Sequence, residues 1–331
     1  MLDTLTDLVS IVPPELWRIV IGLIAVMMFV ALNVILMVYA ERRGAGFIQR
    51  RPGPCEVGPQ GSLQLLADAG KLISKQMVRP TGADPILFWL APVLAFLPVL
   101  LLFMPMPFGP VLTIQSVNLG LLLILAFASI NVLAMLVAGW SSNSKYSLLG
   151  AARAVAQSVA YEIPLLIAVL CIAFQTGSLN LSTIVDQQGS WPWQWNALLQ
   201  PVAFLVFLCC AFAETNRAPF DMAEAESELT GGFHTEYSGM AFGLFFMAEY
   251  ANMVVVCAVC TALFLGGWKG PFIDGFWWYL IKLYALLGFM IWVRWTFPRV
   301  RFDQLLNINW KWLLPLATAN LLGTLFLMKV L

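Results

Sequence analysis

The feature that most constrains this chain is a series of eight apolar runs, each long enough, or nearly so, to cross a bilayer. A helix rises about 1.5 Å per residue, so about 20 apolar residues cross a hydrocarbon core of roughly 30 Å. Of the 331 residues, 60% are hydrophobic and only 11% are charged, which is far from the composition of a soluble domain. The sequence therefore predicts an all-α integral membrane protein, a single membrane domain over residues 1–331. Its eight transmembrane helices are expected at about 16–40, 86–106, 119–140, 155–176, 198–213, 240–265, 276–297 and 312–330.

The basic residues are distributed unevenly over the loops between these runs. All but four of the 18 Lys and Arg residues lie in, or at the ends of, the loops after the first, third, fifth and seventh runs. By the positive-inside rule these loops face the cytoplasm or matrix, so both termini are expected on the periplasmic side or its equivalent. The net charge of the chain is zero, which gives no indication of a nucleic-acid partner.

The loop after the first run, residues 41–85, is unusually long and contains an amphipathic segment at about 61–78. Apolar residues recur on one side of this segment, and Asp68, Lys71 and Lys75 lie on the other. This pattern predicts a helix that lies in the membrane interface rather than across the membrane.

A hydrophilic stretch, residues 214–237, contains six acids between the fifth and sixth runs. Its charged residues recur at spacings of three and four, which predicts one face of a helix. Like charges at this spacing favour protonation of one partner or pairing with a cation. The alternative is a solvated acidic loop between two membrane helices. The residues of this face are Glu214, Arg217, Asp221, Glu224 and Glu228.

Two further acids, Glu162 and Glu249, lie inside apolar runs, each about 13 Å along its helix. An acid at the membrane centre costs about 2.5–3.5 kcal/mol on insertion scales, so both are expected to face the bundle, a partner subunit or water. A carboxylate in such a place can carry protons, and the alternative is a hydrogen bond that packs two helices. The hydroxyl of Tyr250 either extends such a relay or packs.

Neither a metal site nor an iron–sulfur cluster is expected in this chain. Cys257 and Cys260 form a CxxC inside an apolar run, but no second cysteine pair accompanies it and His234 is the only histidine. The sequence also contains no nucleophile motif, phosphate-binding loop or dinucleotide fingerprint. Catalysis by this chain in isolation is therefore not expected.

Several segments of the sequence resemble the quinone-site membrane subunit of respiratory complex I (NADH:quinone oxidoreductase). They are ERRGAGFIQRR, LQLLADAGKL, AGWSSNSKYSLLGAARAVAQSVAYE, ETNRAPFDMAEAESEL with GGFHTEYSGM and FFMAEY, and WTFPRVRFDQLL with WKWLLPL. The resemblance runs from about residue 16 to the C-terminus in the family's order. It implies a membrane subunit of a proton-pumping translocase in the bacterial inner (plasma) membrane, with the mitochondrial inner membrane as the alternative.

The resemblance also implies roles for particular residues. The quinone chamber would be lined or supported by Glu41, Arg42, Asp68, Lys71, Arg217 and Arg294. A carboxylate chain that links quinone chemistry to proton translocation would consist of Glu162, Glu214, Glu224, Glu226, Glu228, Glu249 and Tyr250. The interfacial helix at 61–78 would lie near the quinone entrance.

In this family quinone is the substrate, and flavin and iron–sulfur clusters belong to other subunits. The implied partners are the peripheral-arm iron–sulfur and quinone-site subunits, small membrane subunits and antiporter-like proton-pumping subunits, in addition to the lipid bilayer. Two departures from the family's pattern stand out. Cys55 and Glu56 replace the usual Asn and the Arg that commonly follows it, and Gln76 stands where the family often has Glu. Cys55 and Glu56 are therefore assigned no role in the site.

Three other functions fit parts of the sequence. The related membrane subunit of a membrane-bound hydrogenase or formate hydrogenlyase shares the eight-helix plan and the acidic loop. A cation–proton antiporter would have broken helices or symmetric halves with charges at the midplane, whereas the acids here gather at one face. A passive anchor for soluble redox subunits explains the basic loops but not Glu162 and Glu249.

Overall fold

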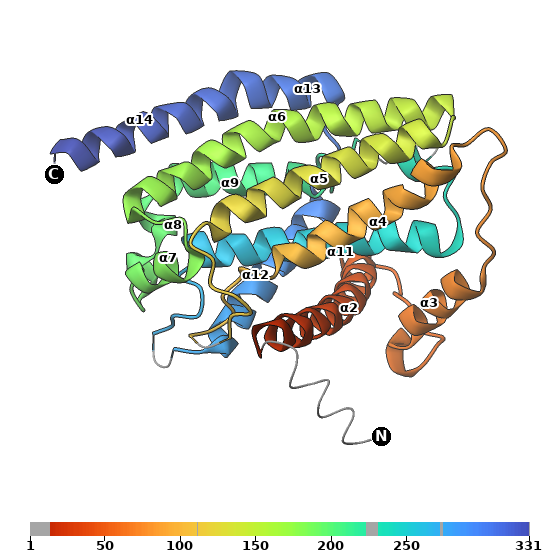
Figure 1. The fold of residues 1–331 in the computed structure, drawn as a ribbon, viewed down its shortest axis with the longest axis horizontal. Coiled ribbons are helices and arrows are strands. Elements are labelled where there is room, and N and C mark those ends of the chain that lie inside the picture. Colours follow the sequence, from red (N-terminus) through yellow and green to blue (C-terminus); the bar gives the residue numbers. More distant parts are fainter. Residues whose placement is uncertain (1–13, 111, 223–230, 272–273, 331) are drawn as a thin grey trace.

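The computed structural model of the chain describes residues 14–110, 112–222, 231–271 and 274–330 (Figure 1). Throughout these ranges the secondary structure is helical, and no strand occurs in them. Seven helices are long and apolar enough to cross a membrane, in agreement with an all-α multi-pass membrane protein. They are α2 (Pro14–Ile48), α4 (Pro85–Leu102), α5 (Gly120–Ser141), α6 (Lys145–Thr176), α11 (Gly239–Phe264), α12 (Phe276–Thr296) and the continuous segment Phe302–Val330.

The eighth expected span corresponds to α9 (Pro201–Glu214), which has only 14 residues. A helix of that length reaches about 21 Å, less than the roughly 30 Å of the hydrocarbon core. Its C-terminal residue, Glu214, is buried in the protein. The structure thus has seven helices of spanning length in the described ranges and one shorter apolar helix whose acidic end is sheltered by its neighbours.

Two long helices extend beyond their predicted ends. The first was expected to stop at residue 40, but α2 continues to Ile48. The fourth was expected to start at residue 155, but α6 starts at Lys145. In both cases the added residues include basic side chains, which form helix readily but do not belong to an apolar run. Hydropathy locates the part of a helix that crosses the bilayer, not where the helix ends.

The remaining elements are short and lie between the long helices. The predicted interfacial segment contains α3 (Gln64–Ser74), whose location in the membrane interface stays a prediction. The others are η1 (Pro59–Gly61), α7 (Leu181–Gln187), η2 (Pro192–Gln194), α8 (Asn196–Leu199), η3 (Gly232–His234), α13 (Phe302–Ile308), the π-helical turn η4 (Asn309–Leu313) and α14 (Leu314–Val330).

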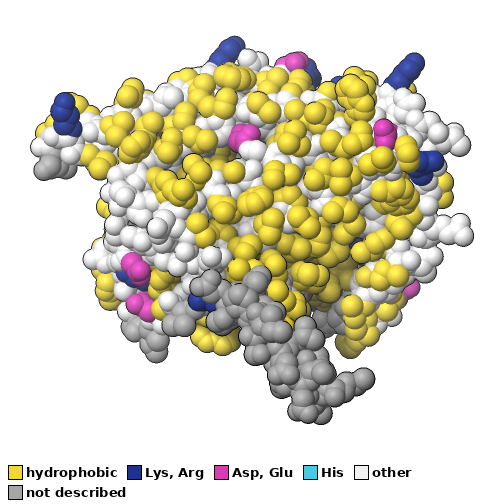
Figure 2. Space-filling model, viewed as in Figure 1, with side chains coloured by type: hydrophobic (Ala, Val, Ile, Leu, Met, Phe, Trp, Pro, Cys, Tyr) yellow, Lys and Arg dark blue, Asp and Glu magenta, His cyan; other side chains and the backbone are white. Residues whose placement is uncertain are grey.

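Helix α11 is the centre of the bundle. It is largely buried and packs against α2, α3, α4, α9 and α12. In Figure 1, α13 and α14 run along one edge of the molecule beside α6, and α2 and α3 lie at the opposite edge. The face seen in Figure 2 is mostly apolar, with its charged side chains mainly near the margins. This surface is the kind that lipid or partner helices cover.

A close approach between α6 and the loop before α11 depends on glycine. A Cβ atom added to Gly150 would lie 2.8 Å from the backbone of Gly232, closer than real Cβ contacts. The adjacent Ser147 donates a hydrogen bond from Oγ to the carbonyl of Phe233, at 2.8 Å. The last part of the hydrophilic stretch is therefore held directly against α6.

Candidate functional site

A groove of about 640 Å³ lies between α2, α3 and α11. Most of its walls are apolar, whereas the end near α3 carries charged side chains. The sequence had assigned three of these charged residues to a quinone chamber, and the structure places all three on the groove. The residues that line the groove include Val38, Arg42, Leu65, Asp68, Lys71, Gly243 and Phe246.

Arg42 and Asp68 form an ion pair across the groove. Arg42 Nη1 donates to Asp68 Oδ2 at 2.6 Å, and Gln64 Nε2 donates to Asp68 Oδ1 at 3.1 Å. Burial alone would raise the pKa of Asp68, but these hydrogen bonds and the charges of Arg42 and Lys71 outweigh it and hold that pKa below its usual value of 3.8. Asp68 is therefore ionised at neutral pH and anchors α3 to the end of α2.

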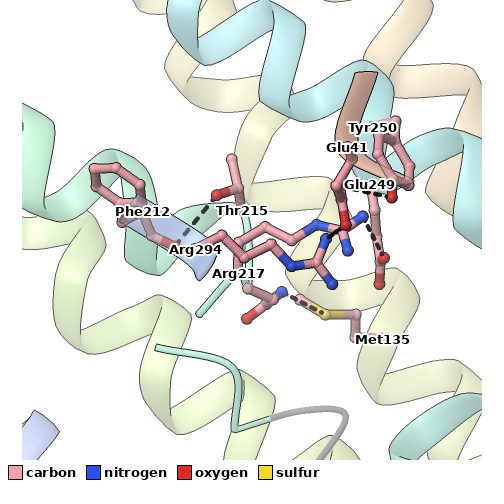
Figure 3. Close-up of polar contacts among 9 residues, drawn as sticks. Glu41, Met135, Phe212, Thr215, Arg217, Glu249, Tyr250 and Arg294 are labelled. Atoms are coloured by element: carbon pink, nitrogen blue, oxygen red, sulfur yellow. Dashed lines mark hydrogen bonds and ion pairs between the residues drawn. The ribbon is translucent and has the colours of Figure 1, made fainter. Parts of the chain in front are cut away.

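A second group of charges lies next to the groove, inside the bundle (Figure 3). We call it the charge cluster and define it as Glu41, Arg217, Glu249, Tyr250 and Arg294. One carboxylate oxygen of Glu41 accepts a hydrogen bond from Arg294, and the two side chains form an ion pair. The other oxygen of Glu41 accepts a hydrogen bond from the hydroxyl of Tyr250 at 2.8 Å. The Glu41 side chain is 9% exposed and that of Arg294 is 21% exposed. A carboxylate buried to this degree needs such partners.

Arg217 completes the charge cluster from the other side. Its guanidinium carbon lies 4.3 Å from the centre of the Tyr250 ring, and its Nη2 lies 3.4 Å from Glu249 Oε2. Figure 3 shows Arg217 and Arg294 extended side by side toward the acids and Tyr250. The cluster thus combines two acids, two cations and one phenol from four separate segments of the chain.

The chain reaches this geometry because α9 ends sharply. Thr215 Oγ1 donates back to the carbonyl of Ala211 at 3.0 Å, and Asn216 adopts a left-handed conformation with φ of 49°, one of the few conformations that Asn supports at a helix end. Gln157 on α6 then holds the turn, since its Nε2 lies 2.8 Å from the carbonyl oxygen of Ala213 and 2.7 Å from that of Phe220. These contacts direct Arg217 into the bundle.

The early end of α9 corrects one expectation. The charged residues at spacings of three and four were predicted to share one helical face, but the helix stops at Glu214. Glu214 faces the interior, whereas Asp221 forms an ion pair with Arg299, with a distance of 3.0 Å between Oδ2 and Nη2. Spacing alone did not reveal that Asn216 would break the helix. The remaining acids of that face, Glu224 and Glu228, and the neighbouring Glu226, lie outside the described residues.

Glu162 and Glu214 line one small cavity of about 40 Å³, together with Asn252 of α11. Glu162 also accepts a hydrogen bond from the hydroxyl of Ser129 on α5. The rest of the cavity is apolar. A cavity of this size with three polar side chains in its lining can hold water, which needs about 10–15 Å³ and two to four polar partners. Two carboxylates that share such a space can exchange protons through water. We call this space the carboxylate cavity.

The carboxylate cavity and the charge cluster are neighbours along two elements. On α11, Glu249 and Tyr250 belong to the charge cluster. Asn252, two residues after Tyr250, lines the carboxylate cavity. At the end of α9, Glu214 lines the cavity, and Arg217, three residues on, belongs to the cluster. The structure therefore gathers the described acids assigned to the proton relay into two adjacent sites.

Sequence reasoning missed the polar residues that support these acids. They are Ser129, Gln157, Thr215 and Asn252. Asn252 follows Glu249 by three residues within an apolar run, and this isolated amide was a signal that could have been used. Ser129 had no such signal, because small residues such as serine are common where helices pack in membranes.

Comparisons with known proteins identify the family to which the chain belongs. The model of a family described as NADH dehydrogenase matches residues 21–325. The H-type subunit of NADH-quinone oxidoreductase from Desulfotalea psychrophila is 52% identical over 313 residues, which cover 91% of this chain and 94% of the relative. The same subunit from Dehalococcoides mccartyi is 49% identical, covering 94% of this chain and 88% of the relative. A third relative, from Geobacter sulfurreducens, is 48% identical, covering 91% and 94%. The chain therefore belongs to the NADH dehydrogenase family, together with these NADH-quinone oxidoreductase subunits.

Proposed function

We propose that this chain is the membrane subunit of a proton-pumping NADH:quinone oxidoreductase that admits quinone and forms part of its chamber. The observation that supports this most is the groove between α2, α3 and α11. A quinone has a long apolar tail and a polar ring, and the groove pairs long apolar walls with a charged end. Small-molecule sites commonly combine apolar walls with a few polar groups that fix orientation.

The path from the groove to the interior follows consecutive residues of α2. Arg42 faces the groove and pairs with Asp68, whereas the preceding Glu41 faces the charge cluster and pairs with Arg294. A quinone ring that approaches the charged end therefore comes close to both groups. This arrangement supports a role for the charge cluster as the inner wall of the chamber.

The charge cluster and the carboxylate cavity support coupling between quinone reduction and proton movement. Reduction of a quinone adds negative charge and takes up two protons. Coupled carboxylates in a low dielectric cannot all ionise, so charge added near Glu41 and Arg217 changes the protonation of their neighbours. The change would pass from Glu249 and Tyr250 to Glu214 and Glu162. The acids Glu224, Glu226 and Glu228 are included in this proposal on the resemblance alone.

The substrate, the partners and the membrane of this chain are also proposed from the resemblance to the family. Quinone is the substrate, whereas flavin and iron–sulfur clusters belong to partner subunits. The partners are the peripheral-arm subunits above the groove, and small and antiporter-like membrane subunits beside the bundle. The bacterial sources of the relatives support a bacterial inner membrane. The basic loops support termini on the periplasmic side and α3 in the interface.

The relatives favour this function over its rivals. They carry the name of a quinone oxidoreductase subunit, rather than that of a hydrogenase. The gathering of Glu162, Glu214 and Glu249 in two adjacent sites differs from the symmetric midplane sites of secondary transporters. A passive anchor would have no need of two acids in one buried cavity.

The proposal is tested by filling the groove without touching a charged residue. Gly243 lines the groove, and a Cβ added there meets Leu72 Cδ1 only at 3.4 Å, so Gly243→Leu projects into the open space. Gly288 on α12 has nothing within 4 Å of an added Cβ and does not line the groove, so Gly288→Leu is the matched control. In the purified complex, Gly243→Leu should raise the KM for quinone several-fold, whereas NADH oxidation by a soluble acceptor stays normal. Equal quinone kinetics in the two variants would exclude the groove as the entrance.

A further inference from the structure

A second large groove lies at the other end of α2, away from the groove and the charge cluster described above. It has a volume of about 630 Å³ and is formed by the N-terminal half of α2, the loop around residues 108–114 and the start of α12. Arg18 and Arg42 are 24 residues apart on this one helix, which separates them by about 36 Å. The two grooves therefore open at opposite surfaces of a bilayer whose core is roughly 30 Å thick.

The walls of this groove are apolar apart from its mouth. Ile21, Ala25 and Phe29 line it from α2, and Phe108 and Ile114 line it from the facing loop. Phe29 and Phe108 close the inner end as an edge-to-face pair, with 5.3 Å between their ring centres. From Arg18 to Phe29 the groove follows eleven residues of helix, about 16 Å. That length matches the depth of one leaflet of the bilayer.

Arg18 is the one charged residue among the described residues that line the groove. Its Nη2 donates to the carbonyl of Thr113 at 3.1 Å, which fixes the guanidinium at the mouth, between α2 and the loop. An arginine presents five N–H donors in a planar fork, a geometry that matches the oxygens of a phosphate. The groove thus combines an apolar slot one leaflet deep with a phosphate-binding cation at its surface end.

We propose that this groove binds one phospholipid of the leaflet at the N-terminal end of α2, with its phosphate against Arg18 and one acyl chain between α2 and the 108–114 loop. Charge complementarity selects this occupant. A quinone ring has no negative charge to place against Arg18, whereas every phospholipid carries a phosphate. The acyl chain fills a slot whose exposed walls include Ile21, 62% exposed, and Leu112, 56% exposed. Within the hydrocarbon layer, an acyl chain that fills the slot gains dispersion contacts with these walls.

Lipid retention by the assembled complex tests the proposal. The complex is purified in mild detergent, washed, and its tightly bound phospholipid is counted by mass spectrometry. Arg18→Leu removes the phosphate contact, and Ala25→Trp fills the slot. Each variant should retain one phospholipid fewer per complex than the wild type. Lys329→Leu removes another terminal cation, and Ile24→Trp places a Trp side chain on α2 outside the groove, so neither control should change the count. Equal counts in all five proteins overturn the proposal.

Photolabelling of the wild-type complex keeps the test valid where a variant fails to assemble. The probe is phosphatidylglycerol with a diazirine near the end of one acyl chain. Label on peptides that contain residues 18–29 or 108–114 is expected, and it should fall several-fold when unlabelled phosphatidylglycerol is added. Label only elsewhere on the chain would overturn the proposal. Labelling that rises when residues 2–10 are deleted would also overturn the proposal, because that segment would then be the occupant of the groove. Labelling that excess phospholipid does not reduce would overturn it as well, since the bound lipid would then be adventitious.

Discussion

Removal of Arg294 should destabilise the bundle more than removal of the Tyr250 hydroxyl, the other described partner of Glu41. Arg294→Met leaves Glu41, whose side chain is 9% exposed, with the Tyr250 hydroxyl as its described partner. Breaking a buried ion pair in this way costs about 3–5 kcal/mol. Tyr250→Phe removes only one hydrogen bond to a charged group, about 1.5–3 kcal/mol, and keeps the ring under the Arg217 guanidinium.

The double variant Glu41→Gln with Arg294→Met tests whether the cost comes from the stranded charge. The double variant leaves no unpaired carboxylate at this position. Its loss of stability should therefore be smaller than the sum of the losses in the two single variants, by on the order of 1.5–3 kcal/mol. The measured quantity is the apparent unfolding temperature of the purified complex, compared between variants under the same conditions. For a domain of this size it changes by on the order of 2 °C per kcal/mol.

The expected order follows from these values. Arg294→Met should lower the unfolding temperature by on the order of 6–10 °C, Tyr250→Phe by less, and the double variant by less than the two single variants together. Additive losses in the double variant would show that Glu41 and Arg294 do not interact, and the described ion pair would then be wrong. A Tyr250→Phe variant less stable than Arg294→Met would refute the reasoning about the stranded carboxylate.

Two further predictions concern the supports of the site. Asp68→Asn should lower quinone reduction to a similar extent at pH 6 and pH 8, because the pKa of Asp68 lies below 3.8 and its ion pair with Arg42 is lost only as the pH falls through that lowered pKa. A loss confined to one of these pH values would contradict the assignment. Gln157→Leu leaves the carbonyls of Ala213 and Phe220 without its amide, at a cost of about 1–3 kcal/mol. Hydrogen exchange of residues 213–220 in the assembled complex should then rise, and unchanged exchange would show that the amide does not hold this turn.

The parts of the fold that depend on local sequence, such as the membrane-spanning part of each helix, were predictable. Apolar runs located the seven helices of spanning length because each run must satisfy its own backbone in lipid. Helix ends were less predictable, since α2 continues through Glu41 and Arg42 to Ile48. This extension matters for function. It carries Glu41 and Arg42 on one rigid helix, so that consecutive residues face the charge cluster and the groove.

The sequence indicated candidate residues for the site but not the contacts between them. Glu41 and Arg294 are 253 positions apart, and nothing in the spacing of either residue reveals the other. The prediction that Glu214 and Asp221 share one helical face is wrong, because Asn216 turns the chain in a left-handed conformation between them. Pairing across the bundle depends on how helices pack, which is a property of the whole sequence rather than of any one segment.

The most direct test of the account is the proton-pumping stoichiometry of Glu214→Gln in reconstituted vesicles. The amide keeps the shape of the side chain and removes its titration, while Glu162 and Asn252 stay in the carboxylate cavity. Asp186→Asn, a change to an exposed acid outside the site, is the control. The account predicts that Glu214→Gln lowers the number of protons pumped per NADH oxidised, or slows quinone reduction together with pumping, whereas Asp186→Asn changes neither. Normal quinone reduction with normal pumping in Glu214→Gln would contradict the proposed coupling through this carboxylate.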